Sequence, residues 1–161
     1  MAFDAFLKVE GVQSESTRAG HEKEIELISF SWGAANPTSI GIGGGGGSGK
    51  VSVSTFNFMK KTDAASAPLF QACCEGKHFP KAVVTLHKAG GKESVDYLKY
   101  EFEKVYVESV QWSGASGGDD VPMESVSFAF GKVVMTYTQQ KDDGSKGAAS
   151  VGSWDLLKVT A

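Results

Sequence analysis

The segment that decides the fold reads Glu24-Ile25-Glu26-Leu27-Ile28-Ser29-Phe30-Ser31-Trp32. Ile25 and Leu27 share one face of an extended chain. The apolar residues after them have the opposite parity, and they are Ile28, Phe30 and Trp32. Because successive side chains of a strand point to opposite faces, a change of parity in mid-strand requires an extra residue or a sharp bend. The segment therefore predicts a strand that passes from one sheet to another.

Three other long segments change parity in the same way, and they span residues 51–59, 98–112 and 125–138. Shorter strands are predicted at residues 3–9, 82–88 and 154–160, which makes about seven or eight strands in all. Strands that curl around a core and change sheets are typical of barrels and strongly bent sandwiches. We therefore predict an all-β fold, a bent two-sheet β-barrel.

One short α-helix is expected beside the barrel. Thr62-Asp63 and Ser66 offer N-cap oxygens, Pro68 suits the first turn, and Gly76 is a stop signal. Gly90-Gly91 and Asp142-Asp143-Gly144 are typical of hairpin turns. The helix is too short to be more than a packing element, so the whole chain, 1–161, is expected to form a single domain.

The composition of the chain argues against several classes of function. The chain has 161 residues, of which 41% are hydrophobic and 22% charged, as expected of a folded domain. Its net charge is −3 and its lysines are scattered, whereas nucleic-acid binders concentrate positive charge on one face. No apolar stretch approaches the roughly 20 residues of a membrane-spanning helix. Nucleic acid and membrane insertion are therefore not expected.

The N-terminus and the cysteines bear on location. Met1-Ala2-Phe3-Asp4 has no basic residue and leads directly into strand-like alternation, which is unlike a signal peptide. Cys73 and Cys74 are adjacent and are the only cysteines, so they build no disulfide framework. We expect a cytoplasmic protein that, if it is secreted, leaves without a cleaved leader.

The most unusual segment is the stretch from Gly33 to Lys50, in which seven of the nine residues from Gly41 to Gly49 are glycine. So long a loop in a compact domain is usually functional. Gly44, Gly49 and Lys50 resemble part of a phosphate-binding loop. Valine replaces the metal-binding hydroxyl at position 51, however, and a strand is predicted where that motif needs a helix. A flexible assembly loop is favoured over a nucleotide site.

No catalytic or metal-binding constellation is recognised. Cys73, Cys74 and His78 are too close in sequence for a typical zinc site, and the cysteines are expected to be a buried structural pair. His21 and His87 are interpreted as surface residues. Carboxylates that alternate with apolar residues, such as Glu24 and Glu26, are assigned to a solvated strand face. The sequence thus predicts no enzyme, no cofactor and no metal.

Several segments in order carry a family resemblance, and they are the opening Ala2-Phe3-Asp4-Ala5-Phe6-Leu7-Lys8-Val9, His21-Glu22-Lys23-Glu24-Ile25, Ser29-Phe30-Ser31-Trp32-Gly33, Gly49-Lys50-Val51, Cys73-Cys74-Glu75-Gly76-Lys77-His78-Phe79-Pro80-Lys81-Ala82, His87-Lys88-Ala89-Gly90-Gly91 and Tyr137-Thr138-Gln139-Gln140-Lys141. Together they resemble the haemolysin-coregulated protein (Hcp) family, the tube subunit of the type VI secretion system. The resemblance covers nearly the whole chain.

The resemblance implies a β-barrel that forms homohexameric rings. These rings stack into a tube that lies inside a contractile sheath, carries a spike protein and holds secreted effectors in its lumen. The segment from Asn36 to Lys50 matches the family's loop that reaches a neighbouring ring, and its candidate contacts are Asn36, Ile40, Ile42, Gly44, Gly46 and Lys50. The region near the lumen is matched by the loop 113–118, so the candidate effector contacts are Trp112, Ser113 and Ser116.

Three other readings stay open at this point. A phage tail-tube protein would share the architecture and differ in genetic context. A cargo-binding β-barrel that acts alone would be a monomer that retains a ligand. A nucleotide hydrolase would use residues 44–50, and it is the weakest of the three.

Overall fold

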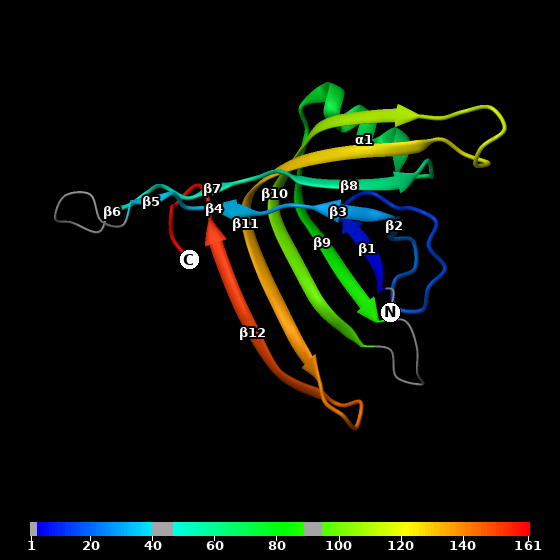
Figure 1. Cartoon of the computed structure of the whole chain (residues 1–161). Helices are drawn as coiled ribbons and strands as arrows, with labels where there is room; N and C mark the ends of the chain where they lie inside the picture. Colours follow the sequence, from blue (N-terminus) through cyan, green and yellow to red (C-terminus); the bar gives the residue numbers. More distant parts are fainter. Residues whose placement is uncertain (1–2, 40–46, 89–94) are drawn as a thin grey trace.

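The structure is a computed structural model that describes residues 3–39, 47–88 and 95–161. Within these residues, eight strands form the main sheet (Figure 1). The strands are β1 (Phe3–Val9), β2 (Ile25–Leu27), β3 (Ser29–Ser31), β8 (Phe56–Lys61), β9 (His78–Lys88), β10 (Asp96–Ser113), β11 (Met123–Gln140) and β12 (Lys146–Asp155). Their order is β2-β1-β9-β10-β11-β8-β3, and β12 also pairs with β11.

The segment 25–31 closes the sheet into a nearly complete barrel. At one end of the sheet β2 pairs with β1, with Ile25 opposite Leu7. At the other end β3 pairs with β8, with Phe30 opposite Phe58. One short stretch of chain therefore joins the two ends of the sheet, and Ile28, where the parity changes, lies between the two strands. The predicted all-β barrel is confirmed, but the segment predicted to pass from one sheet to another instead joins the two ends of a single sheet.

The two longest strands, β10 and β11, are strongly curved (Figure 1), and their pairing register passes over Lys104 and Gly131 near the centre of each strand. Lys104 has a φ of 54°, in the left-handed region that non-glycine residues seldom adopt. Gly131 faces the C-terminal segment so closely that a Cβ atom there would lie 3.2 Å from Leu157 Cδ1. The buried side changes from Phe130 to Val133 across the bend, which is the predicted change of parity.

An aromatic core fills the barrel. Phe56, Phe102 and Phe128 are almost fully buried, and their ring centroids are 5.0–5.2 Å apart. Such pairs contribute about 0.5–1.5 kcal/mol each beyond the area that they bury. Trp32 covers one end of this cluster, with its ring edge-on to Phe102.

The helix α1 (Ser66–Glu75) lies beside the barrel and ends at Gly76, which adopts the left-handed conformation with a φ of 66°. The predicted helix is thus confirmed, but its predicted start needs correction. The N-cap position is Ala65, and no side chain caps it. Asp63 Oδ1 instead accepts a hydrogen bond from the Ala65 amide, while Ser66 Oγ accepts one from the Asp63 amide.

The last strand lies earlier than predicted. A strand was expected at residues 154–160, whereas β12 ends at Asp155. The reason is pairing, because β12 follows β11 from Gln140 back to Lys132 and residues beyond Asp155 turn away. The hairpin turn at 142–144 is confirmed, with a φ of 87° at Gly144. The turn predicted at Gly90-Gly91 lies outside the described residues.

Candidate functional site

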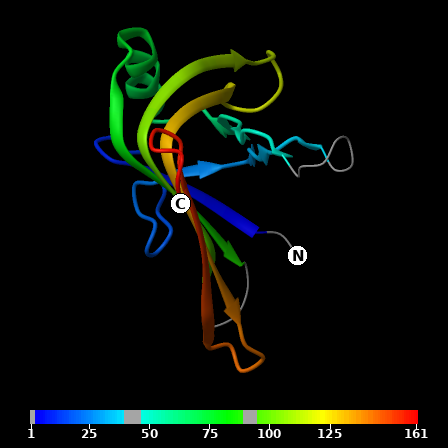
Figure 2. The same ribbon diagram turned by 90° about the vertical axis from the view of Figure 1, so that its left-hand side faces the viewer.

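A narrow hairpin, here called the arm, projects from the barrel in both views (Figures 1 and 2). Its base is formed by β4 (Ala34–Ala35) paired with β7 (Ser52–Val53). Farther out, β5 (Thr38–Ser39) pairs with β6 (Gly47–Ser48). The described ends of the segment from Gly33 to Lys50 therefore leave the barrel as two antiparallel chains, and β7, a strand, follows Lys50 as predicted.

Short hydrogen bonds fasten the arm to the barrel. Gly33 donates its amide to Ser54 Oγ, and the Ser54 amide donates to the Gly33 carbonyl, each at 2.8 Å. Farther out, the Gly49 amide donates to the Pro37 carbonyl at 3.1 Å. A Cβ atom at Gly49 would lie 2.1 Å from that carbonyl oxygen, so the position requires glycine.

The six residues predicted to contact a neighbouring ring divide into two groups. Asn36 and Lys50 are exposed on the described part of the arm. The other four lie outside the described residues, and they are Ile40, Ile42, Gly44 and Gly46.

The loop between β10 and β11 encloses an open pocket at the end of that hairpin. Ser113 and Ser116 line it, together with Gly114, Val121 and Met123. Trp112 is 43% exposed but belongs to the opposite face of β10, because adjacent strand residues alternate. Its ring lies edge-on to Phe70 of α1, with centroids 5.7 Å apart. The three predicted effector contacts are therefore divided between two faces of the hairpin.

A row of buried charges, here called the ionic row, lies on the same face as Trp112. Lys60 and Glu124 have no exposed surface, and Lys60 Nζ lies 2.7 Å from Glu124 Oε2. Lys60 Nζ also lies 2.7 Å from Asp63 Oδ1 and 3.0 Å from Ser66 Oγ. The Trp112 indole N–H donates to Glu124 Oε1. The row thus links β8, β11 and β10 to the start of α1.

Sequence reasoning missed the ionic row, although the signal was present. Glu124 has the parity of Val126 and Phe128, and Lys60 has the parity of Phe56 and Phe58. Both charges therefore continue a buried apolar face. Charged residues are almost never fully buried unless they are paired, so this parity alone would have predicted a partner for each.

An apolar groove lies between the base of the arm and the end of β12. Its lining includes Trp32 and Val53 from the arm side, and Val133, Met135 and Trp154 from β11 and β12. Met135 is 39% exposed although it continues the buried face of Val133. Beside the groove, β12 pairs with β11, and the described residues supply no strand on its other side. A strand edge and an apolar groove are thus adjacent on the surface.

Three expectations about burial were wrong. His21 and His87 are buried, because the loop between β1 and β2 covers the outer face of the sheet and sequence composition does not show such tertiary packing. Glu24 is half-buried rather than solvated, since it accepts a hydrogen bond from His21. Cys74 is exposed and Cys73 half-buried, because α1 turns Cys74 away from the sheet.

The described helix, α1, is neither long enough nor apolar enough to span a membrane.

Acidic side chains at two turns are held in their charged form. At Asp155, the amide N–H of Lys158 lowers the carboxyl pKa despite a smaller opposing effect of burial, and the Leu157 amide adds to the lowering. At Asp143, the hydroxyl and the amide of Ser145 lower the pKa.

These features define a small all-β barrel protein with one flanking helix and a projecting hairpin. Residues 6–137 match the model of the family described as type VI secretion system effector, Hcp. The chain is 42% identical over 157 residues to the protein hcp1 of Pseudomonas aeruginosa, with 97% of this chain and 96% of that one covered. The chain therefore belongs to the Hcp family of the type VI secretion system.

Solved structures agree with this assignment. A structure of a type six secretion system protein superposes with a TM-score of 0.92 at 34% identity, and 99% of each chain is covered. Hcp1 from Salmonella typhimurium superposes with a TM-score of 0.80 at 32% identity, again with 99% of each chain covered. The resemblance seen in the sequence is thus confirmed across the whole fold.

Proposed function

We propose that the chain is the structural subunit of a type VI secretion tube and assembles into rings of six copies. The observation that carries this proposal is the β12 edge with the apolar groove beside it. An unpaired edge is a template for another chain, and native proteins rarely leave one uncovered. A repeated head-to-tail contact that closes on itself gives a ring. Membership in the Hcp family supports the proposal that such rings act in type VI secretion.

Stacking of the rings is assigned to the arm. It stands away from the barrel, and its base is fixed by the bonds at Gly33, Ser54 and Gly49. Asn36 and Lys50 are exposed there, and Ile40, Ile42, Gly44 and Gly46 remain candidates for the same contact. The expelled tube would meet a spike protein at its end and a contractile sheath around it.

Effectors are assigned to the pocket between β10 and β11. Ser113 and Ser116 offer hydroxyls in a wall of small residues, which suits transient contact with varied cargo. Trp112 is assigned a positioning role, because its indole is bonded to Glu124. Such a subunit needs no cofactor and no catalysis, and it would leave the cytoplasm without a cleaved signal peptide.

The solution mass tests the ring. Light scattering after size-exclusion chromatography should give about 102 kDa, six times the 17.0 kDa chain. Met135→Lys places a charge in the groove and should shift the protein to monomer. Val121→Lys is the matched control, since it changes an exposed apolar residue at the pocket loop and should leave the mass unchanged. A wild-type monomer at high concentration would favour the barrel that acts alone.

The arm is tested by deletion of residues 43–47. Rings should persist, and tubes should be shorter by electron microscopy; tubes of unchanged length would refute the assignment. Lys50→Ala should leave the ring mass unchanged. If the wild type bound ATP and this substitution removed the binding, the hypothesis of a nucleotide hydrolase would be supported instead.

Cargo contact is tested by Ser116→Trp. The bulky side chain should fill part of the pocket and reduce the amount of effector that co-purifies with intact rings. Equal co-purification would exclude the pocket as the contact surface.

A further inference from the structure

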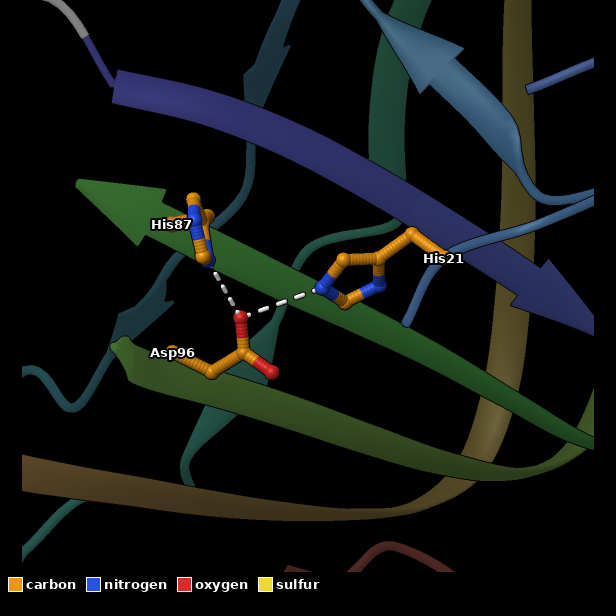
Figure 3. Close-up of side chains that lie close together, drawn as sticks. All are labelled: His21, His87 and Asp96. Atoms are coloured by element: carbon orange, nitrogen blue, oxygen red, sulfur yellow. Dashed lines mark hydrogen bonds and ion pairs between the residues drawn. The ribbon is translucent and has the colours of Figure 1, made fainter. Parts of the chain in front are cut away.

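Two histidines and an aspartate meet on the outer face of the barrel wall (Figure 3). His87 is next to Leu86, which belongs to the main core, so the two side chains leave β9 on opposite faces. Asp96 at the start of β10 lies directly opposite His87. His21 comes from the loop between β1 and β2, which folds over this face. The loop that carries His21 thus meets two neighbouring strands that lie far from it in sequence.

The side chains are close enough to share one ion. Asp96 Oδ1 lies 2.8 Å from His87 Nδ1 and 3.1 Å from His21 Nε2. One potential ligand atom from each of the three residues lies within 4.8 Å of the others. Ligands around a tetrahedral zinc ion lie about 3.3–3.6 Å apart, given bonds of about 2.0–2.2 Å. Small movements of the side chains would therefore make room for an ion.

The charges of the cluster favour a cation. His21 contacts Glu24 through Nδ1 and Asp96 through Nε2, so both ring nitrogens face carboxylates. A neutral imidazole has one N–H, and its second nitrogen would present a lone pair to an anionic oxygen. A metal ion bound to that nitrogen would remove the repulsion. Two carboxylates with two neutral imidazoles carry a charge of about −2, which one divalent cation balances.

The surroundings of the cluster match those of known metal ligands. Metal-bound histidines usually use their other nitrogen to bond a carboxylate, as His21 does with Glu24. The His21 ring also stacks on Phe6 with centroids 4.4 Å apart, which limits its rotation. Asp96 is 43% exposed and gives access to solvent for a fourth ligand.

We infer that His21, His87 and Asp96 form a site for one divalent transition-metal ion, zinc in the first instance, with water as the fourth ligand. Two imidazoles and a carboxylate suit zinc, whereas calcium and magnesium prefer oxygen ligands. The ion would fasten the loop between β1 and β2 to β9 and β10. This inference does not depend on ring formation, because binding is counted per chain.

Equilibrium dialysis of the full chain against zinc sulfate, followed by elemental analysis, tests the site. Wild-type protein should bind one zinc per chain. Asp96→Asn and His87→Gln should abolish this stoichiometric binding. Glu24→Gln keeps all three ligands and should weaken binding by about 10–100-fold. His78→Gln is the matched control, since His78 is the remaining histidine and is exposed near Tyr106; it should bind zinc as the wild type does.

Two further measurements distinguish loss of the site from misfolding of a variant and from zinc binding at another site. In wild-type protein, zinc should shift the ring ¹⁵N resonances of His21 and His87 but not those of His78. A Cys73→Ser/Cys74→Ser variant should still bind one zinc per chain. The inference is overturned if the wild type binds no zinc, if the His87 and Asp96 variants bind it as well as the wild type, or if the serine variant loses it.

Discussion

The two buried polar clusters of the barrel each hold a segment against the sheet, and they do so with different chemistry. The ionic row fastens α1 to the sheet with Lys60 and Glu124, which have no exposed surface. The histidine cluster fastens the loop between β1 and β2 with His21 and His87, and its shared carboxylate, Asp96, is 43% exposed. One cluster is a sealed ion pair, whereas the other reaches solvent.

The difference between the two clusters shows how the burial of a charged side chain limits which partners it can have. Lys60 has three N–H donors, and acceptors on Asp63, Ser66 and Glu124 lie within 3.0 Å of its nitrogen. Removing an ion from water costs several kcal/mol, so such a site is tolerated only when each charge is paired with an opposite one. The histidine cluster is open to solvent at Asp96, which is 43% exposed. The ionic row is therefore expected to be structural, and the histidine cluster responsive.

The largest effect is expected from Lys60→Met. The substitution leaves Glu124 buried without its cation and should lower the free energy of unfolding by about 3–5 kcal/mol. Urea denaturation followed by circular dichroism measures it. Lys61→Met, at the exposed neighbouring position, should change stability by less than about 0.5 kcal/mol.

A double variant sharpens this result. Lys60→Met with Glu124→Leu removes both buried charges and should recover much of the lost stability, because apolar residues often replace buried ion pairs without loss. If Lys60→Met alone were neutral, the row would not hold the helix and the contrast between the clusters would fail.

Trp112→Phe should have the next largest effect. The ring contact with Phe70 is retained, but the hydrogen bond to the Glu124 carboxylate is lost. Hydrogen bonds to charged groups contribute about 1.5–3 kcal/mol, so a loss of that order is expected in urea denaturation. In a Glu124→Leu background the same substitution should cost much less, which a double-mutant cycle would measure. An equal loss in both backgrounds would mean that Trp112 acts through packing alone.

Glu24→Gln in the presence of a chelator should have a smaller effect. Glutamine keeps an acceptor for His21 Nδ1 but removes the charge, so a loss of about 1 kcal/mol is expected from the difference between charged and neutral hydrogen bonds. Glu26→Gln is the control, since Glu26 is exposed on β2, two residues farther along the chain. Equal losses in the two variants would show that the buried contact contributes nothing.

Alternation predicted the barrel well because the parity of a strand is a local property. The change of face between Leu27 and Ile28 was readable from sequence, and the structure places the junction between β2 and β3 there. The end of β12 could not be predicted from the sequence, since it depends on how far β11 extends beside it. The convergence of His21 on His87 and Asp96 could not be read either, because it depends on the path of a loop without periodicity.

The smallest effect is expected from Arg18→Met, in the same loop that carries His21. Arg18 Nη1 lies 3.3 Å from Asp4 Oδ2, and both side chains are about 40% exposed. Exposed pairs contribute about 0.2–1 kcal/mol, so the loss should be of that size at low salt. It should vanish near 1 M salt, where the screening length falls to about 3 Å, whereas the loss in Lys60→Met should persist. If the Arg18 effect also survived high salt, the loop would be held by packing of the arginine stem rather than by charge, and exposure would not be what separates the two kinds of ion pair.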